Sequence, residues 1–276
     1  MLSTLKGLSL SAIQGEFGGG GKISLTEYYK NGSYVSTGLD PVLVGRIPTS
    51  GNIKISNFLG SAKKAPPGNI QYTTAGTFYF TVPIGIYTIT IRMVGGGGGG
   101  GGGGDITRSG AGGGGSGGVF MSYTDLAVIP GHIYMVVVGT GGVGGYTTDY
   151  PFVNNGEGST NGGATYIIDN TTGSRVFTVA GGNRGTGPWY GVGGLGPGGT
   201  SSGHLSGAGH NAYTIFEGGE GGSSYFGRGG LASGSSGPGQ SPALTSYGAG
   251  GGGSGGNVRP ANGGHGINGY VQIKWL

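Results

Sequence analysis

A run of ten consecutive glycines at residues 95–104 constrains this chain more than any other feature. Glycine makes up 76 of the 276 residues, against about 7 % in average proteins, and residues 95–276 hold 62 glycines among 182. Gly loses more backbone freedom on ordering than any other residue. The glycine tracts are therefore either flexible linkers or parts of a regular structure in which backbones pack directly against each other.

The rest of the composition favours a folded protein. Hydrophobic residues still make up 34 % of the chain, which includes 16 Tyr and 9 Phe, whereas charged residues make up only 9 %. Disordered chains are poor in aromatic residues and usually rich in charge. We therefore expect an ordered structure with an unusual backbone arrangement.

Short β-strands alternate with the glycine tracts after residue 65. Seven segments combine β-branched or aromatic residues with the alternating pattern of a strand. They are residues 76–83, 87–94, 119–123, 133–138, 164–168, 175–179 and 270–275. No helix is expected in this part of the chain. The pattern predicts a mainly β fold with an antiparallel β-sandwich or jelly-roll-like core.

Polyglycine-II-type helices are our prediction for the tracts between these strands. Helices of the polyproline-II type have three residues per turn and no internal hydrogen bonds, so their backbone groups can bond to neighbouring helices. Only Gly fits where such helices touch. The tracts lack a strict Gly-X-Y repeat, which excludes collagen. A flexible linker remains the alternative, but the repeated return of the tracts to strands favours a packed bundle.

A Lys-Lys-Ala-Pro-Pro-Gly segment at residues 63–68 marks the boundary between two predicted domains, residues 1–64 and 65–276. The first domain contains three similar segments, residues 8–13, 23–28 and 53–58. Each is predicted to be a minimal strand that turns into one helical turn, with Ser11, Thr26 or Ser56 at the helix N-cap. This domain holds seven Lys/Arg and three Asp/Glu (7 − 3 = +4), and the second holds seven of each. The positive charge suits either an acidic partner or a solvated face.

Catalytic and cofactor motifs have little support. Residues 139–144 fit a dinucleotide-binding pattern, but no helix follows them. Residues 114–118 fit a nucleophile elbow inside a low-complexity tract. The four histidines are not paired with carboxylates at metal-ligand spacing, and there is no Cys. The isolated arginines disfavour nucleic-acid binding, and no apolar stretch is long enough to span a membrane. We expect no enzyme activity, cofactor or metal.

Aromatic residues within the Gly/Ser/Asn-rich stretches are the candidate binding residues. Tyr and Trp give large, rigid contacts at low entropic cost, and the same combination with Ser, Gly and Asn is used by antibody loops. The alternative is that these rings pack locally and hold their own loops. The candidate receptor-binding residues are Trp189, Tyr190, Tyr213, Phe216, Tyr225, Phe226, Tyr146 and Tyr150.

Two parts of the chain resemble bacteriophage proteins. Residues 9–19, 23–29 and 47–60 resemble a module that recurs in phage tail and virion proteins. Residues 80–85, residues 91–94 running into polyglycine, and the closing segment 263–275 resemble the glycine-rich domain of phage tail-fibre proteins and adhesins. The composition is similar to that of fibre-tip adhesins of T-even-like phages, in which polyglycine-II helices form a layered sandwich and distal loops bind outer-membrane proteins. The N-terminal region does not resemble the attachment domain of those adhesins.

The resemblance implies a receptor-binding protein of the virion, assembled in the host cytoplasm. Its partners would be a host surface receptor, either a membrane protein or a polysaccharide, and another tail or fibre protein that binds residues 1–64. It would neither insert into membranes nor bind nucleic acid. A purely structural tail component is the main alternative. An ice-binding protein would need a flatter face of small residues, and a depolymerase would need paired carboxylates.

Overall fold

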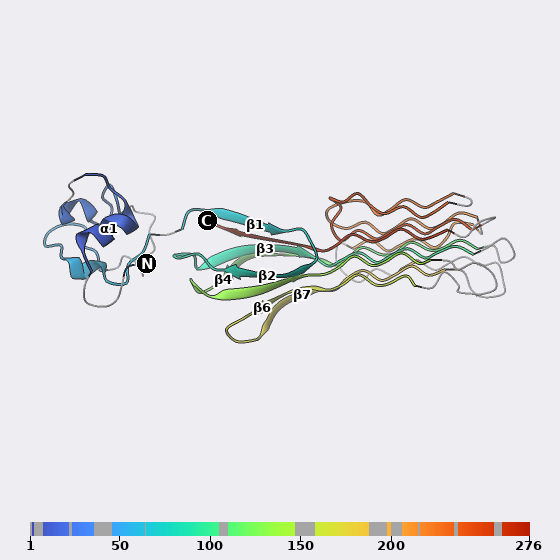
Figure 1. The fold of residues 1–276 in the computed structure, drawn as a ribbon, viewed down its shortest axis with the longest axis horizontal. Helices are drawn as coiled ribbons and strands as arrows, with labels where there is room; N and C mark the ends of the chain where they lie inside the picture. Colours follow the sequence, from blue (N-terminus) through green and yellow to red (C-terminus); the bar gives the residue numbers. More distant parts are fainter. Residues whose placement is uncertain are drawn as a thin grey trace.

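The computed structural model places three parts along one long axis (Figure 1). A small N-terminal module lies at one end, a β-sandwich lies in the middle, and a bundle of extended segments forms the other end. The C-terminus lies at the sandwich. The structure describes residues 2, 8–21, 24–35, 46–63, 65–104, 110–146, 158–187, 198–199, 206–214, 216–234, 237–256 and 261–276.

Three short helices form the N-terminal module, one for each predicted repeat. They are α1 (Leu10–Phe17), η1 (Leu25–Tyr28) and η2 (Ile55–Phe58), the last two being 3₁₀ turns. The predicted helical turns are confirmed, but their predicted starts are wrong by two residues. The N-caps are Ser9, Ser24 and Lys54, and neither Leu8 nor Ile53 lies in a strand. Ile23 lies outside the described residues.

Capping hydrogen bonds explain the earlier helix starts. The Ser9 hydroxyl accepts the Ala12 N–H (3.2 Å). In the other two turns the third helical residue bonds back to the cap: the Glu27 carboxylate accepts the Ser24 N–H (3.1 Å), and the Asn57 side chain accepts the Lys54 N–H (2.7 Å). Backbone donors at a helix start need such partners. The apolar residue that alternation assigned to a strand is therefore already the first helical residue.

The three repeats converge on one aromatic core. Phe58 is fully buried and contacts Phe17 and Tyr28 edge-on, with ring centroids 6.1 and 6.2 Å apart. Ile13 is also fully buried, and the Tyr28 hydroxyl donates to the Gly18 carbonyl (2.8 Å). Each helical turn thus supplies at least one side chain to this core, which is distinct from that of the sandwich.

Eight antiparallel strands form the sandwich as two four-stranded sheets. One sheet has the order β1-β8-β3-β4 and the other β2-β5-β6-β7. The strands are β1 (Gly68–Tyr72), β2 (Gly76–Thr81), β3 (Thr88–Val94), β4 (Phe120–Ala127), β5 (Ile133–Val138), β6 (Thr165–Asp169), β7 (Arg175–Val179) and β8 (Tyr270–Trp275). The predicted mainly β sandwich is confirmed. The jelly-roll-like connectivity stays a prediction.

Alternating apolar residues from both sheets fill the space between them. Ile91 and Met93 of β3 and Ile273 of β8 face Val136 of β5 and Ile167 of β6, and all five are almost completely buried. All seven predicted strands are present, although β4 continues four residues beyond its predicted end. The residues between β2 and β3 form a turn that carries the chain from one sheet to the other.

Strand β1 was missing from the prediction because it directly follows the two prolines of the predicted linker. It pairs with β8 along its whole length. Gly68 lies against the Trp275 ring, where a Cβ atom would collide with the indole, and the Trp275 Nε1–H donates to the Pro66 carbonyl (2.9 Å). The segment between the two domains is therefore partly fixed to the sandwich.

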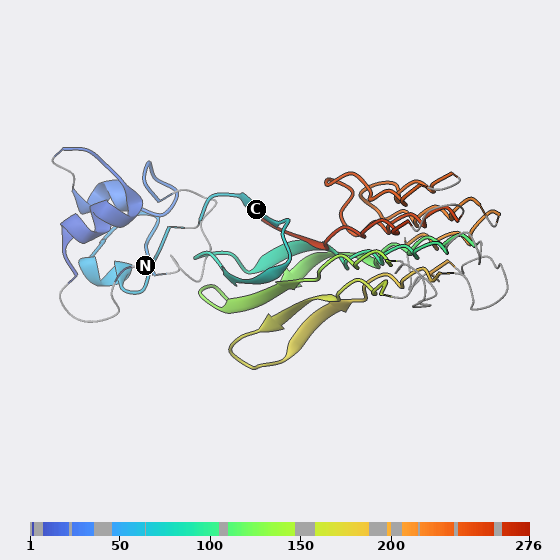
Figure 2. The same ribbon diagram turned by 45° about the vertical axis from the view of Figure 1, so that its right-hand side comes forward.

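Extended segments run side by side beyond the sheets in a bundle (Figure 2). Residues 95–104 occupy its interior, and their hydrogen bonds repeat every three residues. Their N–H groups donate to three antiparallel segments, residues 110–119, 160–163 and 261–267, and their carbonyls accept from three parallel ones, residues 142–145, 182–185 and 251–254. In one such set the donor and acceptor pairs are Gly95–Val119, Gly98–Ser116, Gly101–Gly113 and Gly104–Gly110.

The period of three in these hydrogen bonds matches the three residues per turn of a polyproline-II-type helix. A Cβ atom would collide with the Ala180 carbonyl at Gly95, the Asn183 carbonyl at Gly98 and the Thr186 carbonyl at Gly101. With the same spacing of three residues, Gly96 and Gly99 face a second segment at residues 140 and 143. Gly97 and Gly100 face a third segment at residues 249 and 252. The described tracts are therefore packed rather than flexible linkers. The polyglycine-II-type conformation of the tracts stays a prediction.

Replacing one interior glycine should destabilise the bundle. A Gly99→Ala side chain would collide with the backbone of Val143 and Gly144, whereas Gly234 has open space around it and serves as the matched control. We expect Gly99→Ala to lower the free energy of unfolding by about 2 kcal/mol or more and Gly234→Ala to change it by less than about 0.5 kcal/mol. Chemical unfolding followed by circular dichroism measures both. Equal stability of the two variants would contradict the close packing.

Candidate functional site

The far end of the bundle is the part of the chain most distant from the N-terminal module (Figure 1). Val94, Val138 and Val179 end β3, β5 and β7, and each continues directly into a bundle segment. Residues 95–104 lead away from the end of β3, and their hydrogen bonds to neighbouring segments extend from Gly95 to Gly104. The bundle therefore separates the sandwich from the far end of the molecule.

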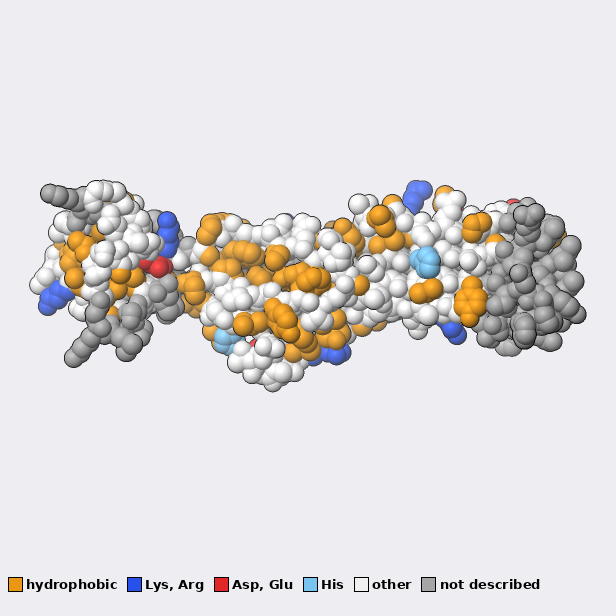
Figure 3. Space-filling view, in the orientation of Figure 1, with side chains coloured by type: hydrophobic (Ala, Val, Ile, Leu, Met, Phe, Trp, Pro, Cys, Tyr) orange, Lys and Arg blue, Asp and Glu red, His pale blue; other side chains and the backbone are white. Residues whose placement is uncertain are grey.

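Five of the eight predicted receptor-binding residues lie in the described part of the chain. The three that lie outside the described residues are Tyr150, Trp189 and Tyr190. Three described ones, Tyr146, Tyr213 and Phe216, are 46 %, 50 % and 41 % exposed. Large exposed hydrophobic residues are not confined to the bundle, since Tyr79 on the sandwich is 63 % exposed, and Figure 3 shows hydrophobic side chains over both parts.

Tyr213 and Phe216 are held by a tight turn. The Thr214 hydroxyl accepts the N–H groups of Phe216 (3.1 Å) and Glu217 (3.0 Å), and the Glu217 carbonyl accepts the Tyr213 N–H (3.0 Å). The Tyr213 hydroxyl lies 3.0 Å from Nδ1 of His210. These hydrogen bonds hold the backbone at Tyr213, Phe216 and Glu217 in place.

Two carboxylates lie near this turn, those of Glu217 within it and of Glu220 close to Tyr213. Burial raises the pKa of Tyr213, and the nearby Glu220 carboxylate raises it further, so the phenol stays protonated at neutral pH.

The Phe216 carbonyl accepts the Gly256 N–H (3.2 Å), which ties the turn to the far end of the bundle. Tyr146 follows Gly145, which also bonds to the last part of the glycine tract at Gly100. These three aromatic residues therefore lie toward the end away from the sheets.

Tyr225 and Phe226 lie elsewhere, at the junction of bundle and sandwich. Tyr225 is 51 % exposed and stacks on Phe120, the first residue of β4, with centroids 3.9 Å apart. Phe226 is half-buried, and its ring contacts those of Phe120, Tyr247 and Tyr270. The sequence left open whether these rings bind a receptor or pack, and Phe226 packs against a cluster at the strand ends. Its partners in that cluster were not predicted.

The two residues of this pair should differ in their effect on stability. Phe226→Ala removes a ring that contacts three aromatic neighbours, and we expect it to lower the free energy of unfolding by about 2 to 3 kcal/mol, somewhat less than for a fully buried Phe. Tyr225→Ala, at a half-exposed site, should cost less than about 1 kcal/mol. Urea titrations of the two variants test this, and a larger loss for Tyr225→Ala would contradict the assigned packing.

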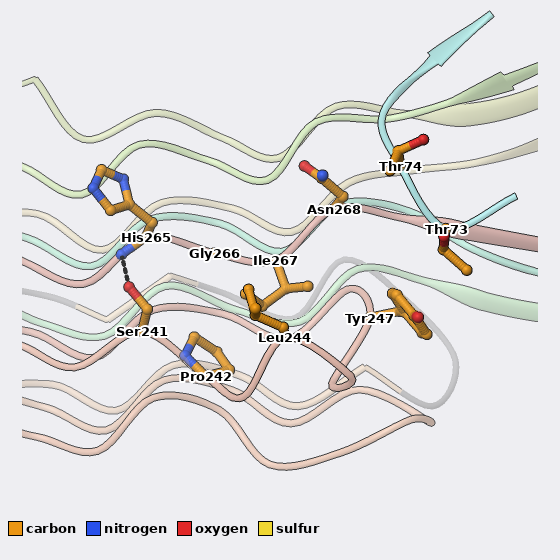
Figure 4. Close-up of a pocket in the computed structure, with 10 residues that line it drawn as sticks. All are labelled: Thr73, Thr74, Ser241, Pro242, Leu244, Tyr247, His265, Gly266, Ile267 and Asn268. Atoms are coloured by element: carbon orange, nitrogen blue, oxygen red, sulfur yellow. Dashed lines mark hydrogen bonds between the residues drawn. The ribbon is translucent and has the colours of Figure 1, made fainter.

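An open groove lies on the side of the bundle next to the sandwich (Figure 4). Its volume is about 500 Å³, and it is formed by the turn after β1 at Thr73, the loop from Ser241 to Tyr247, and the segment from His265 to Asn268. Sequence reasoning missed it, because its walls come from three segments far apart in the chain. The sequence feature that could have pointed to the groove is the glycine-free stretch around Pro242 and Leu244.

Metal and membrane sites are not evident in the part of the chain that the structure describes. No three His, Asp or Glu side chains there come together as a metal ion would require. No described helix has both the length and the apolar character needed to cross a bilayer.

Sequence comparison assigns the second domain to a family. The model of the family Gly_rich_2, described as a glycine-rich domain, matches residues 73–276. This range covers the β-sandwich from the turn after β1 onward and the whole described bundle. No curated protein sequence matches the chain. Because the match spans most of its length, the chain belongs to the glycine-rich domain family.

Proposed function

We propose that this protein is a bacteriophage tail-fibre or tail-tip adhesin that recognises a structure on the host surface without breaking bonds. The observation that carries the proposal is the polarity of the molecule: a module with its own core lies at one end, and the far end of a closely packed glycine bundle lies at the other (Figure 1). Binding residues are often placed on loops held by a rigid scaffold. The resemblance of the N-terminal repeats to phage virion modules supports a location in the tail.

The exposed turn at Tyr213 and Phe216 supports a binding role for the far end. Aromatic rings held in a fixed turn lose little conformational freedom on binding. The receptor would be a membrane protein or a polysaccharide, and Trp189, Tyr190 and Tyr150 are proposed to take part. A purely structural tail component would have the same scaffold and would not bind cells.

Binding of the fluorescently tagged full chain to a panel of bacterial strains tests the proposal. We expect strain-selective binding that falls at least about tenfold, or roughly 1.4 kcal/mol, in a Tyr213→Ala, Phe216→Ala variant. A Tyr79→Ala, Ile129→Ala variant is the matched control, since both residues are exposed on the sandwich side of the molecule. Equal loss in both variants would show nonspecific adhesion. Binding to none of the strains would favour the structural component.

Residues 1–64 are proposed to dock to another tail protein, and their three repeats are proposed to match a trimeric fibre end. Cross-linking of assembled tails, followed by mass spectrometry, should link Lys30, Lys54 or Lys63 to a neighbouring tail protein. All three lysines lie in the described part of the N-terminal module. Cross-links confined to Lys274 of the sandwich would contradict the docking role of the module.

A further inference from the structure

We infer that the groove between the turn after β1 and the bundle binds a short neutral carbohydrate. The inference does not depend on receptor binding at the far end. The groove lies beyond the end of β1 rather than along its free edge, so it does not offer a strand for a peptide to pair with. Its volume of about 500 Å³ falls within the usual range of small-molecule sites, about 300–1,000 Å³.

The groove combines apolar surface with hydrogen-bonding groups and carries no charged side chain. Leu244 is 83 % exposed, and Ile267 and Pro242 are buried beneath the surface. In Figure 4 Leu244 and Ile267 lie in the middle of the groove, His265 and Ser241 at one end and Tyr247 and Thr73 at the other. None of the lining residues, all of them described, is Asp, Glu, Lys or Arg. A charged ligand would find no counter-charge here, which favours a neutral one.

Hydrogen bonds fix the polar side chains around the groove. In Figure 4 the His265 ring and the Asn268 side chain point away from Leu244 and Pro242, so Ser241 is the residue of this wall that offers a hydroxyl group to a ligand. Nδ1 of His265 accepts the Gly144 N–H (3.2 Å), so the neutral ring carries its proton on Nε2. Ser241 accepts the His265 N–H (2.9 Å) and can still donate its own hydroxyl proton. Oδ1 of Asn268 accepts the Gly141 N–H (2.8 Å).

The turn opposite adds hydroxyl groups. Thr73 and Thr74 are exposed, and neither hydroxyl has a hydrogen-bond partner among the described residues. The ring of Tyr247 is supported from behind by Tyr270, on which it stacks with centroids 4.9 Å apart. Sugar rings present C–H patches and hydroxyl groups side by side, and a braced aromatic ring beside uncharged donors and acceptors complements both. This chemistry identifies a neutral saccharide as the ligand.

Saturation-transfer NMR and calorimetry on the full chain test the inference, with maltose, cellobiose, lactose and N,N′-diacetylchitobiose as probes. We expect at least one of them to bind. Thr74→Trp places a bulky ring at the groove and should weaken that binding about tenfold or more, the effect of losing roughly 1.4 kcal/mol. Leu244→Asp should also weaken it. Thr77→Trp, at an exposed position on β2 outside the groove, is the control and should leave it unchanged.

Three outcomes would overturn the inference. They are no binding of any of the four sugars at millimolar concentration, equal binding by the wild-type and Thr74→Trp proteins, and tighter binding of sialyllactose than of lactose. Circular dichroism of each variant verifies that the fold is intact. Because this assay uses isolated sugars and variants near the sandwich, its failure is distinguishable from failure of the cell-binding test at Tyr213 and Phe216.

Discussion

Backbone hydrogen bonds between neighbouring glycine segments are the interaction on which the rest of the structure depends. Ordering the backbone of one residue costs about 1–2 kcal/mol in conformational entropy, and this cost is highest for Gly. One intramolecular hydrogen bond stabilises the folded state by a net contribution of about 0.5–1.5 kcal/mol. These opposing effects are similar in size, and glycine adds no side chain to bury. The segments that follow β3, β5 and β7 are therefore stabilised by the sandwich, because these three strands hold their near ends at a fixed spacing.

Outer segments of the bundle lack neighbours on one side, as the edge strands of a sheet do. Side chains supply the missing acceptors at several of these positions. Asn268 accepts the Gly141 N–H, Thr160 accepts the Val143 N–H (2.8 Å), and Asn161 accepts the Arg184 N–H (2.9 Å). The non-glycine residues of the tracts thus have two uses: they complete hydrogen bonding at the edge, and they present side chains to solvent.

Much of the fold followed from residue patterns, because strands such as β5 and β7 carry strong alternation and the glycine content allowed few solutions. The pairing of segments did not, since a run of identical glycines carries no information about which neighbour it meets. Strand β1 was missed because two prolines precede it, and the contacts of Phe226 were not predicted because its partners Phe120 and Tyr270 are distant in sequence. The groove was unpredictable for the same reason. Whether the far-end aromatic residues bind a receptor stays a prediction.

The three-residue repeat of the hydrogen bonds limits how such a bundle can change in length. Inserting one residue within 95–104 would turn every later residue by a third of a turn and direct each N–H toward the wrong neighbour, whereas inserting three would restore the original pairing one layer further out. The loops themselves are free of this restriction. Variation in this protein should therefore accumulate as loop changes of any length and as tract changes in multiples of three.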